Sequence, residues 1–173
     1  MGWIVFLRGA NVGGHRTFRP SLLAEQLDRH DVRNVGAAGT FVVRGAHRPG
    51  TLAAEFQKRL PFETTVQVCP AREFLELVRR NPFGGAPARR GERRSVSIMD
   101  SSPRTPSGLP LRVPGGSRWQ VQLVAVRGRF ALCIWRRLGR ALLYPNEVVE
   151  KHFGVRATTR GWDTVLKIRD LLS

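Results

Sequence analysis

The stretch that decides the fold is Trp3–Leu7 (WIVFL), followed at once by Arg8–Arg16 (RGANVGGHR). Five consecutive apolar residues have the length of a buried strand, and the glycines after them end it. Pro20 then opens a segment whose apolar residues have helical spacing. The sequence therefore predicts that the chain begins with a strand, a glycine-rich loop and a helix.

The following residues extend this pattern. Two short strands are predicted on either side of a glycine turn, over 32–35 and 40–44. A second helix is expected from Pro49, and residues 63–69 alternate between apolar and polar side chains as a half-buried strand does. The order βαββαβ over residues 1–70 predicts a ferredoxin-like subdomain.

Residues 71–173 predict a second α+β subdomain that resembles the first in kind. The fold class expected for the whole chain is α+β, with two ferredoxin-like (βαββαβ-type) subdomains and antiparallel sheets. The elements expected in the second part are a helix at 71–80, a strand at 95–99, a hairpin at 119–135 and helices at 146–153 and 159–172.

Two segments of this second part, 82–94 and 101–116, are rich in proline, glycine and arginine and are expected to be loops. One interpretation is a basic arm that becomes ordered on a polyanion, and the alternative is a solvated connection without a partner. The candidates for polyanion contact are Arg89, Arg90, Arg93 and Arg94.

Charge is the strongest property of the composition. The 173 residues include 29 basic and 13 acidic side chains, a formal net charge of +16, and 26 of the basic residues are arginine. Such a surplus favours nucleic acid or another polyanion as a partner, whereas a basic surface with no dedicated partner is the alternative. The first interpretation predicts that arginines 89, 90, 93, 94, 104, 112, 118 and 127 converge on one face.

The loop Arg8–Arg16 permits two interpretations. Its glycines and the flanking basic residues Arg8, His15 and Arg16 could cradle a phosphate, although the spacing matches neither of the two common glycine-rich phosphate motifs. Alternatively, it is a tight turn in which Asn11 ties the loop to itself.

No catalytic constellation is present, and we expect no cofactor and no metal. The four histidines are far apart in sequence, no Gly-x-Ser-x-Gly motif occurs, and Cys69 and Cys133 lie in apolar segments that predict reduced core thiols.

No segment reaches the length of a membrane span, so the expected location is the cytoplasm, without a membrane partner. The oligomeric state stays open.

Three segments resemble one known family. Phe6–Gly14 (FLRGANVGG) is similar to the LLRGINVGG signature of an uncharacterised bacterial family, domain of unknown function 1697. Residues 32–43 occupy the place of that family's VRTYIQSGNVVF, and Ala157–Lys167 (ATTRGWDTVLK) resembles its ATTRNWNTVLK.

This resemblance implies a duplicated α+β arrangement with ferredoxin-like subdomains and no established activity. The residues that it points to are Arg8, Asn11, Gly13 and Gly14 in the first motif and Thr158, Thr159, Arg160, Trp162 and Thr164 in the last. The middle motif has lost its tyrosine, glutamine, serine and asparagine here, and two asparagines of the last motif are Gly161 and Asp163. A ligand held by those groups would be bound differently or not at all.

Aromatic residues raise two further alternatives. Phe41, with Trp3 or Phe6, could form the base-stacking platform of an RNA-recognition sheet, or it could belong to the core. Trp162, with Arg160 beside it, could stack on a base near a helix start, or it could pack under a helix that Thr158 or Thr159 caps.

The function expected from the sequence is non-enzymatic binding of nucleic acid or another polyanion through an arginine-rich face. The alternative is a binding protein or enzyme for a small phosphorylated ligand, with a site built by the Arg8–Arg16 loop and the Thr158–Thr164 helix start. Its candidate residues are Arg8, Asn11, Gly13, Gly14, Arg16, Thr159, Arg160 and Trp162. A third alternative is a protein that self-associates through sheet edges.

Overall fold

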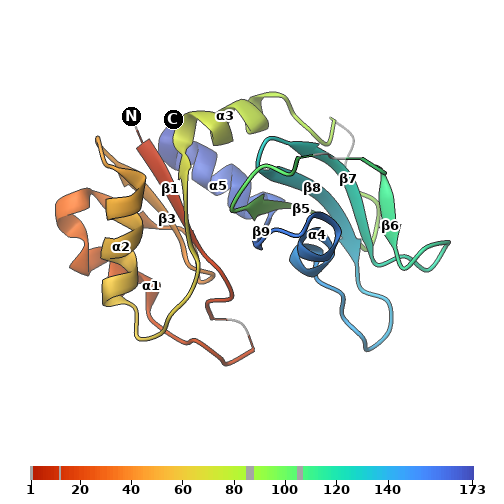
Figure 1. The fold of residues 1–173 in the computed structure, drawn as a ribbon, viewed down its shortest axis with the longest axis horizontal. Helices are drawn as coiled ribbons and strands as arrows, with labels where there is room; N and C mark the ends of the chain where they lie inside the picture. The colour runs from red at the N-terminus through yellow and green to blue at the C-terminus, as the bar shows by residue number, and fades with distance from the viewer. Residues whose placement is uncertain (1, 12, 85–87, 105–106) are drawn as a thin grey trace. The chain divides into compact units, whose positions relative to one another are not determined.

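The computed structural model describes residues 2–11, 13–84, 88–104 and 107–173 (Figure 1). Val12 of the first motif and residues 85–87 and 105–106 of the two predicted loops lie outside the described residues. The chain divides into unit 1, Met1–Arg80 with Leu166–Ser173, and unit 2, Asn81–Val165. Among the described residues, none of the helices is both long and apolar enough to cross a membrane.

Unit 1 has the βαββαβ order that the sequence predicts. Its sheet has the strand order β2-β3-β1-β4, and every neighbouring pair is antiparallel. This is the ferredoxin-like arrangement. Its elements are β1 (Gly2–Leu7), α1 (Pro20–Gln26), a 3-10 turn (Asp28–His30), β2 (Val32–Asn34), β3 (Thr40–Arg44), α2 (Pro49–Arg59), β4 (Val66–Pro70) and α3 (Ala71–Arg79).

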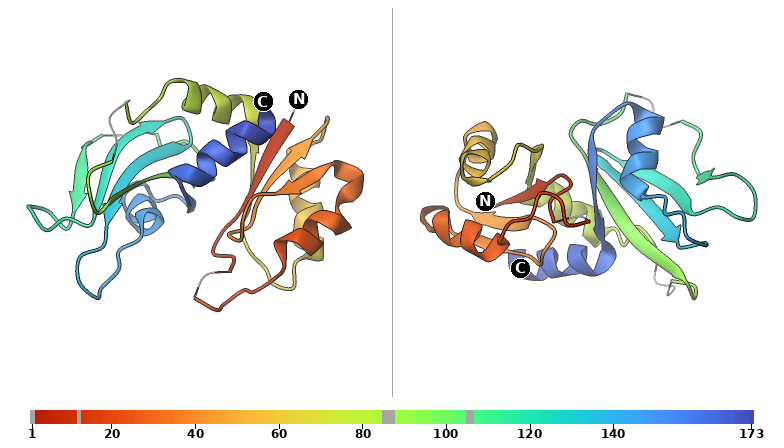
Figure 2. Two further views of the ribbon diagram at one scale, coloured as in Figure 1. Left: turned by 180° about the vertical axis from the view of Figure 1, so that it is seen from behind. Right: turned by 90° about the horizontal axis from the view of Figure 1, so that it is seen from below.

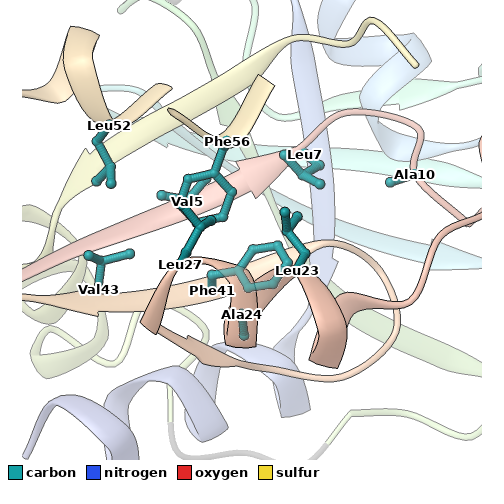
Figure 3. Packing of buried hydrophobic residues seen from close by; sticks show 10 residues of the cluster. All are labelled: Val5, Leu7, Ala10, Leu23, Ala24, Leu27, Phe41, Val43, Leu52 and Phe56. Carbon is teal, nitrogen blue, oxygen red and sulfur yellow. The ribbon is translucent and has the colours of Figure 1, made fainter. Parts of the chain in front are cut away.

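The main core of unit 1 lies between one face of this sheet and the helices α1 and α2 (Figures 1 and 3). Alternate residues of β1 and β3 point into it, as the period of a strand requires, and Phe41 meets Phe56 with ring centroids 5.1 Å apart. On the opposite face Phe6 packs against Phe74 of α3. Because Phe6 and Phe41 are fully buried, they are core residues and form no base-stacking platform.

Helix α3 groups with unit 1, ten residues beyond the boundary at residue 70 that the sequence suggested. Its buried face consists of Ala71, Phe74, Leu77 and Val78. The last residues of the chain also group with unit 1, where Arg44 Nη2 donates to the Leu171 carbonyl at 3.1 Å. The chain thus leaves unit 1, builds unit 2 and returns.

Unit 2 contains a five-stranded antiparallel sheet in the order β6-β7-β8-β5-β9, with β6 at one edge (Figure 2). Helix α5 begins in unit 2 and ends in unit 1. The elements are β5 (Glu92–Met99), β6 (Leu111–Val113), β7 (Val121–Arg127), β8 (Phe130–Arg136), α4 (Pro145–Phe153), β9 (Ala157–Gly161) and α5 (Trp162–Leu172).

The order β7-β8-β5-β9 matches β2-β3-β1-β4 of unit 1, and α4 takes the place of α2. The first helix of the ferredoxin-like pattern has no counterpart among the described residues of unit 2, where β6 occurs instead. The expected α+β class with two antiparallel sheets is confirmed. The helix expected from Thr159 is wrong in its first turn, because Ala157–Gly161 pair with β5 as a strand and neither Thr158 nor Thr159 caps α5.

The core of unit 2 lies between α4 and one face of its sheet. Met99, Leu123, Cys133 and Ala157 pack there with Val149 of α4. Cys69 and Cys133 are both buried thiols, and burial raises the pKa of the Cys133 thiol to about 12. Both thiols are therefore reduced core residues, as the apolar sequence around them predicts.

Candidate functional site

The Arg8–Arg16 loop is organised by Asn11. Its side-chain Nδ2 donates to the carbonyls of Phe18 at 3.2 Å and Ala37 at 2.8 Å, and its Oδ1 accepts from the Phe18 backbone N–H at 2.9 Å. Both amide hydrogens and the amide oxygen are therefore occupied. Asn11 also has a φ of 54°, a conformation that asparagine tolerates better than most residues. Asn11 holds the loop in shape.

The other candidates of this loop have different surroundings. Arg8 is half-buried, and its backbone carbonyl accepts a hydrogen bond from Thr64 Oγ1 at 2.5 Å. Gly13, Gly14 and Arg16 are exposed and adopt positive φ values. The Arg16 carbonyl closes the loop by accepting from the Asn11 N–H at 3.2 Å. The structure thus favours a hydrogen-bonded turn, with its exposed side formed by glycines and Arg16.

The second motif lies in β9 and at the start of α5. Arg160 is 5% exposed, and its guanidinium donates to Thr158 Oγ1 at 2.8 Å and to the Thr159 carbonyl at 2.9 Å. Burial lowers the pKa of this guanidinium to about 10. Thr159 Oγ1 lies 2.6 Å from Ser97 Oγ on β5. Trp162 is half-buried as the first residue of α5, and Thr164 is the third residue of the same helix.

These two motifs belong to different units. The loop from Arg8 to Arg16 lies in unit 1, whereas Thr158–Thr164 lies in unit 2. A shared phosphate site therefore stays a prediction. Asn11 in the first motif and Arg160 in the second donate hydrogen bonds to other groups of the protein. These contacts give both side chains a structural role.

The strand register gathers arginines at one end of the unit 2 sheet. Arg93 on β5 pairs with Trp135 on β8, and Arg94 pairs with Ile134 one step along. Ile134 pairs with Gln122 on β7, which pairs with Arg112 on β6. We call this the arginine end of the sheet. Its members on the strands and in the adjoining loops are Arg89, Arg90, Arg93, Arg94, Arg112, Arg118, Arg136 and Arg137.

The predicted convergence of eight arginines is partial. Arg127 ends β7 and pairs with Phe130, at the opposite end of the sheet and about 20 Å along the strand. Arg104 follows β5 beyond the same opposite end. The other six belong to the arginine end. Strand alternation also divides them between two faces, because Arg93 lies on the face that α4 covers and Arg94 and Arg112 lie on the other.

Aromatic rings alternate with these guanidinium groups. Arg93 lies over Trp135, with its guanidinium carbon 5.5 Å from the ring centroid, and Arg94 lies at the same distance over Phe83. Phe83 in turn meets Trp162 edge-on at 5.1 Å. On β6 and β8, two guanidinium groups lie over the indole of Trp119, that of Arg112 at 5.4 Å and that of Arg136 at 4.0 Å.

Three of the four tryptophans in the chain are therefore at this one sheet end. Trp135 and Trp162 are half-buried, and Trp119 is buried. Sequence reasoning did not connect Trp119 or Trp135 with the basic loops, and it missed Arg136. The signal was present in the hairpin, because the residues before β7 and at the end of β8 must meet once the two strands pair.

The charge of the chain is concentrated in unit 2. Its residues 81–165 include 15 basic and 5 acidic side chains, a surplus of ten out of the total of sixteen. Within the described parts of the chain, neither Arg93 nor Arg112 forms an ion pair with a carboxylate, and both are exposed. The acids near this end are Glu92, opposite Arg136 in the register, and Asp163.

Fold and surface together define a class: an α+β protein of two ferredoxin-like units, one of which has an arginine-rich sheet end. A family model described as a protein of unknown function (DUF1697) matches residues 1–124, and the chain belongs to this family. This confirms the family that the resemblance names, over residues 1–124; the third motif, Ala157–Lys167, lies outside the matched residues.

A solved structure supports the fold. The conserved bacterial protein SP0830 from Streptococcus pneumoniae is similar over 99% of this chain and 98% of its own, with a TM-score of 0.59 and 16% sequence identity. At this identity the likeness concerns the fold alone. No curated protein matches the sequence.

Proposed function

We propose that the protein is a non-enzymatic nucleic-acid-binding protein and that the arginine end of the unit 2 sheet is its binding surface. The observation that carries this proposal is the exposure of Arg93 and Arg112 together with the groups that surround them. Each is exposed, each has its guanidinium carbon over a tryptophan ring, at 5.5 Å and 5.4 Å from the centroid, and neither is paired with a carboxylate within the described chain.

Stacking prepares a guanidinium group for phosphate. A guanidinium over an aromatic ring gains a cation–π attraction without using its five N–H groups, which stay available as donors. The ring also restricts the rotamers of a long side chain, so less conformational entropy is lost when a phosphate is bound. Arg93 and Arg112 are therefore oriented donors whose hydrogen-bonding edge is available.

The surrounding charge supports the same conclusion. Arg89, Arg90, Arg118 and Arg137 lie in the loops that adjoin this end, and all are exposed. A cluster of like charges with few acids around it raises the local potential and attracts a polyanion. Nucleic acid is the polyanion whose bases can also use the neighbouring aromatic rings.

The test is fluorescence anisotropy of a labelled oligonucleotide, with affinity measured as a function of salt. We expect binding that persists at about 150 mM salt. The double variant R93A/R112A should lower the slope of log affinity against log salt by about one to two units, because two phosphate contacts are lost.

The matched control is R72A/R79A, which removes the same charge from exposed positions of α3 in unit 1. If both double variants reduce binding equally, the interaction is non-specific attraction to net charge and the proposed surface is wrong. If the wild-type protein does not bind at about 150 mM salt, the proposed function is wrong.

A further inference from the structure

We propose that the arginine end recognises single-stranded nucleic acid and that Trp135 stacks on one of its bases. This inference rests on the proposed function and goes beyond it, because it names the strandedness of the ligand and a residue that contacts a base. Two features of the sheet end carry it: the arginines lie on both faces of one sheet, and half-buried aromatic rings lie between them.

The distribution over two faces argues against a duplex. Arg93 points to the face that α4 covers, whereas Arg94 and Arg112 point to the opposite face. A duplex is stiff, with a persistence length of about 50 nm, and it presents phosphates on one convex surface. A major groove about 12 Å wide admits a two-stranded ribbon with side chains on both faces, but the four strands from β6 to β5 span about 14 Å before their side chains are counted, which is too wide. A flexible single strand can cross the end of the sheet and contact both faces.

The aromatic rings argue for unpaired bases. Trp135 is a half-buried residue, and the guanidinium carbon of Arg93 lies 5.5 Å from the centroid of its ring. In a duplex the faces of the bases are covered by their neighbours, whereas in a single strand they are free to stack on a side chain. An arginine next to such a ring reaches the phosphate of the stacked nucleotide.

Trp135 is a better candidate than the other rings at this end. Trp119 is 6% exposed, and two guanidinium groups lie over its indole. Trp162 is half-buried and has Phe83 packed edge-on against it. Among the described residues, Arg93 is the one arginine whose guanidinium lies over the Trp135 ring, and it is exposed. The unit 2 sheet therefore offers one ring and one exposed, oriented guanidinium as a pair for a nucleotide.

The experiment compares probes that separate charge from stacking. Four probes of about 20 units are used: oligothymidylate, oligouridylate, a DNA duplex and an abasic DNA strand that keeps the phosphates but has no bases. We expect the two single strands to bind at least about five-fold more tightly than the abasic strand, the lower limit for stacking of one base. Comparison of the affinities for oligothymidylate and oligouridylate shows whether the protein prefers DNA or RNA.

Variants assign the effect to one ring. W135L should bring the affinity for oligothymidylate close to that of the abasic strand, and W135F, which keeps an aromatic face, should retain most of the difference. If W135L fails to fold, two measurements still test the inference. They are the affinity of W135F for oligothymidylate, and the difference in affinity of the wild-type protein between oligothymidylate and the abasic strand. Quenching of tryptophan fluorescence by oligothymidylate, reduced in W135F, is the independent readout.

The outcomes distinguish the two proposals. Equal binding of the abasic strand and oligothymidylate, or stronger binding of the duplex than of either single strand, overturns this inference and leaves polyanion binding intact. An unchanged preference for bases in W135L also overturns it, because another ring then does the stacking. Absence of binding to all four probes overturns the proposed function itself.

Discussion

The guanidinium carbon of Arg136 lies 4.0 Å from the centroid of the Trp119 indole, and its Nε donates to the Trp119 backbone carbonyl at 2.7 Å. A further hydrogen bond joins Arg136 Nη2 to the Ser117 carbonyl. One side chain thus fixes the segment before β7 to the end of β8. Its role differs from that of Arg112, which lies over the same indole at 5.4 Å.

This difference gives a first prediction. R136A should lower the free energy of unfolding of unit 2 by about 1–3 kcal/mol, because hydrogen bonds from a charged donor to two carbonyls are lost. R112A should cost less than about 1 kcal/mol, since it removes only a cation–π contact at an exposed position. Urea unfolding followed by tryptophan fluorescence measures both. Equal losses would show that Arg136 does not hold this segment.

Asn11 gives a second prediction. Both N11A and N11G remove three hydrogen bonds, which should destabilise unit 1 by about 1–3 kcal/mol. N11A should cost about 1 kcal/mol more than N11G, because an alanine at a φ of 54° is strained and glycine is not. Thermal unfolding of the two variants checks the order. If the alanine variant is as stable as the wild type, the side chain is free to contact a ligand instead.

Gly39 and Gly14 form a matched pair for a third prediction. Both have positive φ values, 68° and 76°. A Cβ on Gly39 would lie 2.8 Å from Leu7 Cβ, whereas a Cβ on Gly14 would have nothing within 4 Å. G39A should therefore lower the free energy of unfolding by about 2 kcal/mol or more. G14A should lower it by about 1 kcal/mol, the cost of backbone strain alone. Chemical unfolding curves compare them, and equal stabilities would contradict the packing of Gly39 against β1.

The buried thiols give a fourth prediction. Burial raises the pKa of Cys133 to about 12, so the native state holds its proton more tightly than the unfolded chain does. The contribution of this thiol to the free energy of unfolding should be fully present below about pH 8.5, the ordinary thiol pKa. It should fall as the pH rises from there towards 12. A thiol reagent at pH 8 should label neither cysteine until denaturant is added. Rapid labelling of the native protein would show that a cysteine is accessible.

Much of unit 1 could be predicted from the sequence because its signals are local. The apolar run at Trp3–Leu7, the prolines that open α1 and α2, and the alternation in 63–69 each correspond to one element. Unit 2 was harder. Leu111–Val113 is a strand of three residues between two prolines, and it is formed by pairing with β7 and not by its own pattern.

The site depends even more on long-range pairing. Thr159–Gly161 was expected to open the final helix because a threonine there was expected to cap it, whereas its pairing with β5 makes it a strand. The arginine end unites residues from 83 to 162, which become neighbours only through the registers of β5, β7 and β8. Composition predicted the charge, but the stacking of guanidinium groups on tryptophans required the fold.

Photochemical cross-linking of the full chain to an oligonucleotide, followed by identification of the modified peptides, would locate the nucleic-acid-binding surface. The account predicts cross-links in the segments around Arg93, Arg112 and Trp135, all of them at one end of the unit 2 sheet. Cross-links concentrated in the Arg8–Arg16 loop, or spread evenly over both units, would contradict it.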